Sequence, residues 1–172
     1  LVVPALPFFQ REFDTSASWV TWIATGFLLS SSVLTPILGK LGDSKGKKRM
    51  LVISLGIFGC ASLGAAAAWN LPSLIFFRVV QGAGAAVFPL SFGIIRDEFP
   101  PEKIGLGIGT VSSVFGAGGG IGLVLSGVII EHLSWHWLFL IGAVPVLGAT
   151  VLLALFVPES PVKNPARIDW LG

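Results

Sequence analysis

Long apolar runs separated by short polar segments make up most of this chain. Five runs are almost free of charged side chains, at about 19–39, 50–69, 72–95, 104–129 and 137–157. Each approaches or exceeds the roughly 20 residues that an α-helix needs to cross the hydrocarbon core of a bilayer. The pattern therefore predicts five complete membrane-spanning helices.

The two ends of the chain predict partial elements. Residues 1–9 contain Pro4 and Pro7 and are interpreted as the remnant of a first helix that is cut short. The segment 158–172 is rich in proline and charge, and we expect a cytoplasmic linker there followed by the start of a further helix. The expected fold is an all-α membrane protein whose transmembrane bundle occupies residues 1–157.

Composition supports a membrane bundle over a soluble domain. Apolar residues make up 53% of the 172 positions and charged residues only 12%. Cys60 is the one cysteine and permits no internal disulfide. The residues contain no nucleophile–base pair or metal cluster, so we expect no enzymatic activity, no metal and no cofactor. His132 and His136 are four apart and could hold a metal, but anchoring at the membrane interface is the favoured interpretation.

Lysine and arginine positions predict the orientation of the bundle. One set of connections carries nine of the eleven basic residues: Lys40, Lys45, Lys47, Lys48, Arg49, Arg96, Lys103, Lys163 and Arg167. The alternate set carries only Arg11. Basic residues concentrate in cytoplasmic loops, so segments 40–49, 96–103 and 158–167 are predicted to be cytoplasmic. The opposite helix ends carry an expected interfacial belt of tryptophans: Trp19, Trp22, Trp69, Trp135 and Trp137. Because the basic block lies between two spans, it does not indicate nucleic-acid binding.

The connection between the first two complete spans contains a patterned group of residues. They are Gly39, Leu41, Asp43, Gly46, Lys47, Lys48 and Leu51. The glycines allow a tight reversal, and Asp43 can accept hydrogen bonds or pair with a cation. Arg96, at the cytoplasmic end of the span 72–95, is the partner that we expect for Asp43. The alternative is that the lysines only set the topology.

The span 72–95 contains one arginine. Arg78 follows Pro72 by six residues and so lies roughly 9 Å into the span, with Gln81 one turn further along the same face. An arginine in a span costs about 2.5–3.5 kcal/mol on insertion scales and usually faces a polar cavity. The alternative is that its side chain reaches the outer headgroups. No acidic side chain lies in the five complete spans.

The span 104–129 is rich in glycine. Gly109, Gly118, Gly122 and Gly127 create a smooth surface that another helix can approach closely. Generic packing of small residues is the alternative interpretation of this face.

Together these residues resemble the N-terminal half of a major facilitator superfamily transporter, most closely the fourteen-span drug:proton antiporters. The first group resembles G-x-L-A-D-R-x-G-R-K-x-x-L, with Gly42 and Ser44 in place of alanine and arginine. The second matches the fourth-helix pattern completely, through Leu74, Arg78, Gln81, Gly82, Gly84, Ala85 and Ala86. The third resembles G-x8-G-x3-G-P-x-x-G-G, with Leu123 in place of proline and Ser126 in place of glycine.

The resemblance implies a six-helix bundle built from two inverted three-helix repeats. Substrate would bind in a cavity partly lined by the helices at 19–39, 72–95 and 104–129. Arg78 and Gln81 would serve proton coupling, the 39–51 loop with Arg96 would be a conformational latch, and the Gly109–Gly127 face would be a sliding surface. The missing C-terminal half of the same chain, lipid and protons would be its partners.

The implied function is proton-driven efflux of hydrophobic or amphipathic small molecules across a bacterial plasma membrane, with no cofactor. Two alternatives stay open. One is proton-coupled uptake or symport of a polar metabolite, and the other is a non-transporting membrane scaffold that reuses the fold. A scaffold should tolerate Arg78→Ala, whereas a coupled transporter should lose gradient-driven flux.

Overall fold

The computed structural model describes residues 2–157 of the chain. The expected linker and further helix at 158–172, including Lys163 and Arg167, lie outside the described residues. Most of the described residues are helical, and none of them forms a strand. This confirms the all-α fold class.

Nine helical segments follow one another along the described chain. They are η1 (Val3–Ala5), α1 (Leu6–Glu12), α2 (Ala17–Lys45), α3 (Lys47–Ala66), α4 (Leu71–Gln81), η2 (Gly82–Ala86), α5 (Val87–Glu98), α6 (Pro101–His132) and α7 (Trp137–Phe156). Five stretches are long and apolar enough to cross a membrane: α2, α3, α4 through α5, α6 and α7. The chain is therefore an integral, multi-pass membrane protein.

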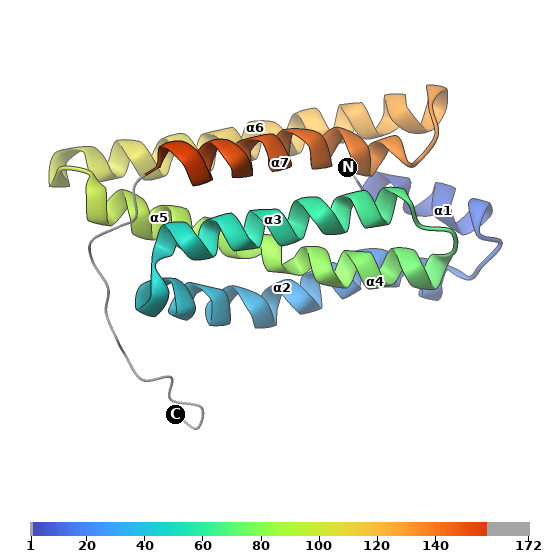
Figure 1. Ribbon diagram of the computed structural model, residues 1–172. Helices are drawn as coiled ribbons and strands as arrows, with labels where there is room; N and C mark the ends of the chain where they lie inside the picture. The colour runs from blue at the N-terminus through green and yellow to red at the C-terminus, as the bar shows by residue number, and fades with distance from the viewer. Residues whose placement is uncertain (1, 158–172) are drawn as a thin grey trace.

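The long helices run side by side along one common direction (Figure 1). In this view α6 and α7 lie along one side of the bundle and α2 and α4 along the other, with α3 and α5 between them. Helix α3 packs most extensively on α7, and α2 packs on α4 and η2. We call the end that carries residues 40–49 and 96–103 the basic end.

At the basic end, α2 and α3 meet with almost no loop between them. Helix α2 extends to Lys45 and α3 begins at Lys47, so most of the segment expected to be a loop is helical. Gly46 alone makes the reversal, with φ of 112°, a conformation that favours glycine. Gly39 and Gly42 lie inside α2. Gly42 instead permits close packing, since a Cβ there would lie 2.3 Å from Leu90 Cδ2.

The span that carries Arg78 is interrupted at its middle by a 3₁₀ segment. Helix α4 ends at Gln81, η2 covers Gly82–Ala86, and α5 continues to Glu98. Pro89 follows three residues later and cannot donate a backbone hydrogen bond, which disfavours a regular α-helical turn just before it. The expected span is thus one transmembrane crossing with a tightened centre.

Two apolar clusters form the core, one near each end of the bundle. The basic-end cluster contains Met50, Leu51, Ala86 and Leu90. The larger cluster at the opposite end joins the first helical residues to α2, α3, α4, α6 and α7. Trp135 belongs to this larger cluster and is only 5% exposed, whereas Trp69 is 77% exposed. Trp135 packs edge-on against Phe9, so it is covered by the bundle at the end opposite the basic end.

Helix α6 is the least covered of the spanning helices. Its buried residues, Gly107, Ser126 and Ile129, lie near its two ends. Every residue from 112 to 121 is exposed. The middle of α6 therefore presents an open face within the described part of the chain.

Candidate functional site

Arg78 lies on α4 with its guanidinium directed into the bundle. Its Nε donates to the carbonyl oxygen of Ile23 on α2 at 3.0 Å, and its NH1 donates to Gln81 Oε1 at 2.7 Å. The guanidinium carbon lies 4.4 Å from the centre of the Phe27 ring, in a cation–π arrangement. The side chain is thus held between α2 and α4, inside the bundle.

A chain of hydrogen bonds continues from Arg78 into α3. Gln81 Nε2 donates to Ser62 Oγ at 2.6 Å, and Ser62 Oγ donates to the carbonyl oxygen of Phe58 at 2.8 Å. Gln81 and Ser62 are each 2% exposed. Buried polar groups are costly unless they are hydrogen-bonded, so this chain stabilises a polar centre inside an apolar span.

Arg78, Gln81 and Ser62 line one cavity of about 340 Å³. The rest of its wall is mainly apolar and comes from η1, α2, α3 and α7, with Phe27, Phe58, Leu138 and Phe139 among the lining residues. The expected contribution from the helix at 104–129 is absent from this cavity, because α6 supplies none of its lining residues. A cavity of this kind suits an apolar or amphipathic molecule beside a fixed cation.

The local sequence explains where Arg78 is placed. Asn70 caps α4 by accepting a hydrogen bond from the Ser73 backbone N–H at 2.8 Å, and Ser73 completes a reciprocal capping box. Pro72 occupies the first turn, where its missing N–H costs nothing. With the start of α4 fixed in this way, Arg78 and Gln81 lie one turn apart on the same face, as expected.

The two glycines after Gln81 allow α2 and α3 to approach. A Cβ at Gly82 would lie 2.5 Å from Ser30 Oγ and 2.8 Å from the backbone nitrogen of Ser31, both on α2. A Cβ at Gly84 would lie 2.4 Å from the Phe58 ring on α3. These glycines therefore bring three helices together around the polar centre.

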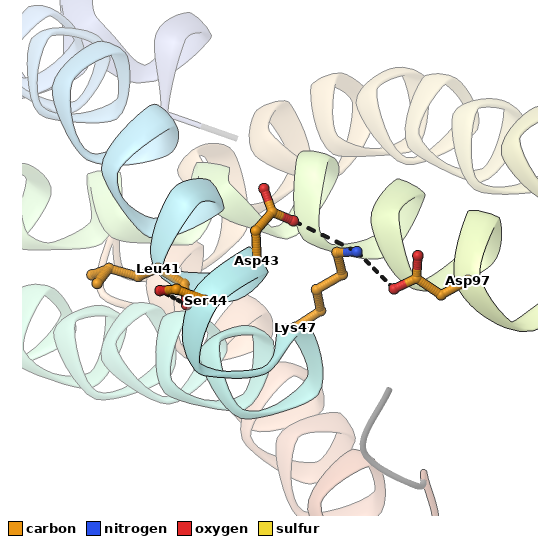
Figure 2. Close-up of polar contacts among 5 residues, drawn as sticks. All are labelled: Leu41, Asp43, Ser44, Lys47 and Asp97. Atoms are coloured by element: carbon orange, nitrogen blue, oxygen red, sulfur yellow. Dashed lines mark hydrogen bonds and ion pairs between the residues drawn. The ribbon is translucent and has the colours of Figure 1, made fainter. Parts of the chain in front are cut away.

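A second charged group lies at the basic end. Lys47 Nζ lies 2.6 Å from Asp97 Oδ2 on α5 and 3.5 Å from Asp43 Oδ1 on α2. Figure 2 shows Lys47 between the two carboxylates. The Lys47 and Asp97 side chains are each 12% exposed, and the Asp43 side chain is 54% exposed. Asp43 thus pairs with Lys47, whereas Arg96, the expected partner, is exposed.

The remaining residues of the expected latch lie around this group. Lys48 Nζ donates to the carbonyl oxygen of Ala154, near the end of α7, at 3.0 Å. Leu41 accepts a hydrogen bond from Ser44 within α2 and packs against the basic-end cluster. Gly39 lies 4.0 Å, measured from its ideal Cβ position, from Pro89. The start of α3 therefore contacts the ends of both α5 and α7.

The glycines of α6 lie apart from both charged groups. No atom lies within 4 Å of an ideal Cβ at Gly109, Gly118 or Gly127, and Gly122 is partly buried. Within residues 2–157, no other helix therefore packs against Gly109, Gly118 or Gly127.

Sequence reasoning missed three residues that the structure brings to these sites. Ser62 and Phe27 contact the Gln81 and Arg78 side chains, and Asp97 pairs with Lys47. Ser62 and Phe27 belong to no motif, and an ordinary serine or phenylalanine in an apolar helix carries no signal of its own. Asp97 adjoins Arg96 and was a visible candidate, being an acidic residue at the end of the same span.

Comparison with known proteins places these features in context. The Major Facilitator Superfamily profile matches residues 1–170. Multidrug resistance protein 3 of Bacillus subtilis is 35% identical over 88% of the chain, and the tetracenomycin C resistance and export protein of Streptomyces glaucescens is 32% identical over its full length. Efflux pump dotC of Dothistroma septosporum is also 32% identical over the whole chain. The chain spans about a third of the length of these relatives, with 30%, 32% and 30% covered.

Proposed function

Because the chain belongs to the Major Facilitator Superfamily, we propose that the protein containing it is a secondary active exporter, in which proton entry drives efflux of hydrophobic or amphipathic molecules. The basic end would face the cytoplasm of a bacterial plasma membrane. Energy would come from the proton gradient, without a cofactor and without enzymatic chemistry. The remaining helices of the transporter would complete the site, since alternating access requires two halves that rock around it.

The observation that carries this proposal is the cationic side chain of Arg78 at the wall of an apolar cavity. A fixed cation favours the charged form of a nearby carboxylate. A coupling carboxylate elsewhere in the full-length protein would therefore bind or release its proton according to its distance from Arg78. The aromatic lining contributed by Phe27 and Phe58 would contact the apolar body of the exported molecule.

Two observations favour export over uptake. The cavity wall is mainly apolar and offers few of the hydrogen-bonding groups that a polar metabolite needs. The compared relatives from Bacillus, Streptomyces and Dothistroma carry names that refer to drug resistance, export or efflux.

The test uses the full-length protein in proteoliposomes with an imposed pH gradient and a fluorescent amphipathic dye. The wild type should drive dye movement against the direction of proton flow. Arg78→Ala should abolish gradient-driven flux, because the fixed cation at the cavity is lost, and Arg78→Lys should retain part of it.

Arg11→Ala supplies the matched control, since Arg11 is exposed on α1 and, among residues 2–157, its side chain bonds only the carbonyl oxygen of Pro7. It should transport at the wild-type rate. Symport of dye with protons would support the uptake alternative. Full transport activity in Arg78→Ala would show that the coupling assignment is wrong, and absence of any gradient-driven flux in the wild type would support the scaffold alternative.

A further inference from the structure

We propose that Ser62, on α3 and outside every motif of the chain, is a positioning residue that orients the Gln81 amide and, through it, the Arg78 guanidinium. The inference rests on the proposed proton-coupled function. It assigns to α3 a direct role in the polar centre, in addition to its packing against α7.

The direction of each hydrogen bond fixes the orientation of the Gln81 amide. An arginine side chain only donates, so the oxygen of the amide must face Arg78. The amide nitrogen then faces Ser62, which accepts at 2.6 Å. The Ser62 hydroxyl proton is directed to the Phe58 carbonyl oxygen, 2.8 Å away. Gln81 and Ser62 therefore each accept one hydrogen bond and donate one, and all the donors point from Arg78 toward Phe58.

Ser62 connects this chain of hydrogen bonds to α3. Without it, Gln81 Nε2 would lose its acceptor in a position that is 2% exposed. A buried donor without a partner is strongly unfavourable, so the amide would rotate or move toward another acceptor. The Gln81 oxygen would then no longer be held at 2.7 Å from Arg78 NH1.

The same attachment links Arg78 to the relative position of two helices. Arg78 and Gln81 move with α4, and Ser62 moves with α3. A shift of α3 along α4 would break the Gln81–Ser62 bond and release the guanidinium from one of its two hydrogen-bond partners. In this way Ser62 would make the position of the cation depend on how α3 and α4 are packed.

The test compares two fluxes through the full-length transporter in proteoliposomes. One is dye accumulation driven by a pH gradient, and the other is exchange of dye at equal pH on both sides, which needs no net proton movement. Ser62→Ala removes the acceptor. Ser62→Cys keeps a similar volume and a weak acceptor.

Ser54→Ala is the matched control. Ser54 lies on the same helix, is 0% exposed, and its Oγ has no hydrogen-bond partner within the described residues. Its loss should change neither flux. Ser62→Ala should lower gradient-driven accumulation about tenfold, the size expected for one lost buried hydrogen bond, while exchange stays within about twofold. Ser62→Cys should give an intermediate accumulation.

Four outcomes would overturn the inference. Equal loss of both fluxes together with a lower unfolding temperature would make Ser62 a packing residue. A selective loss of exchange would make it a substrate contact. Unchanged fluxes in Ser62→Ala, with flux lost in Arg78→Ala, would reject the role of Ser62 and leave the proposed function standing. Absence of gradient-driven flux in the wild type would instead reject both.

Discussion

Lys47 shows how one basic residue at a helix junction differs from its neighbours. It lies between Asp43 and Asp97, with both it and Asp97 largely covered. Hydrogen bonds between charged groups are stronger when water is excluded. Lys45, two residues earlier, is exposed at the end of α2. Two lysines in one basic block therefore have different roles, and of the two it is Lys47 that joins α2, α3 and α5.

Replacement of Lys47 by methionine should destabilise the bundle. Methionine keeps an unbranched side chain but removes the charge, so the close contact with the Asp97 carboxylate is lost. We expect the free energy of unfolding to fall by about 1–3 kcal/mol. The measurement is the thermal unfolding of the purified full-length protein in detergent. Lys45→Met is the control and should unfold at the wild-type temperature. Equal unfolding temperatures for both variants would contradict this account.

Charge and motif patterns predicted some residues of the site and not others. Arg78 and Gln81 were predictable, because an arginine in an apolar span needs a polar environment and Gln81 follows at one-turn spacing. Their placement at the cavity agrees with that interpretation. The pairing of Asp43 with Arg96 was wrong, because it was inferred only from the expected positions of two helix ends. Which side chain faces Asp43 depends on the rotation of α5, and this rotation is set by tertiary packing.

The crossing formed by α4, η2 and α5 shows, at the scale of an element, why small residues follow Arg78 and Gln81. Gly82 lies against Ser30 and Ser31 of α2 at distances that leave no space for a methyl group. By contrast, Gly56 on α3 has no atom within 4 Å of its ideal Cβ position. Glycine is thus required by a close backbone approach at one position and not at the other.

Gly82→Ala and Gly56→Ala therefore form a matched pair. The added methyl at Gly82 meets the backbone of α2, which cannot rotate away, so we expect a loss of about 1–3 kcal/mol in stability. Gly56→Ala should be neutral or stabilising by up to about 1 kcal/mol, because alanine favours the helix. Thermal unfolding of each variant measures the difference. Similar unfolding temperatures would show that α2 and η2 are less closely packed than described.

On the scale of the whole molecule, the middle of α6 is exposed from residue 112 to residue 121, and the described bundle leaves it uncovered. Val124 is 71% exposed and Phe115 is 62% exposed, although Phe115 contacts the Phe88 ring edge-on. Glycines on this face allow another helix to approach closely. In a two-halved transporter, we infer that the second half covers this face.

Gly118→Leu tests that inference in the full-length protein. No atom lies within 4 Å of an ideal Cβ at Gly118, so the larger side chain fits the described bundle. If a second half packs there, leucine should overpack the contact and reduce dye transport about tenfold. Gly148→Leu on α7 is the control, since Gly148 is equally open. Equal transport by both variants would indicate that this α6 face contacts only lipid.

Apolar patterning was sufficient for the fold class but not for its details. Run lengths predicted five crossings, since each must match the thickness of the bilayer. They did not predict that α2 would continue to Lys45, because charged residues at a helix end remain compatible with helical geometry. They also did not predict η2. A 3₁₀ segment leaves the apolar pattern unchanged and depends on Pro89 and on close packing of Gly82 and Gly84.

The 3₁₀ geometry of η2 determines how Arg78 and Asp97 are oriented relative to each other around the helix axis. A 3₁₀ residue advances the helix by about 20° more and by about 0.5 Å more than an α-helical residue. Over the five residues of η2 this amounts to about 100° of additional rotation and about 2.5 Å of additional length. Conversion of η2 to regular α-helix would swing Asp97 about a quarter turn around the helix axis relative to Arg78. A change of helix type in η2 would then couple the cavity at Arg78 to the contact between Lys47 and Asp97 through rotation of a single crossing.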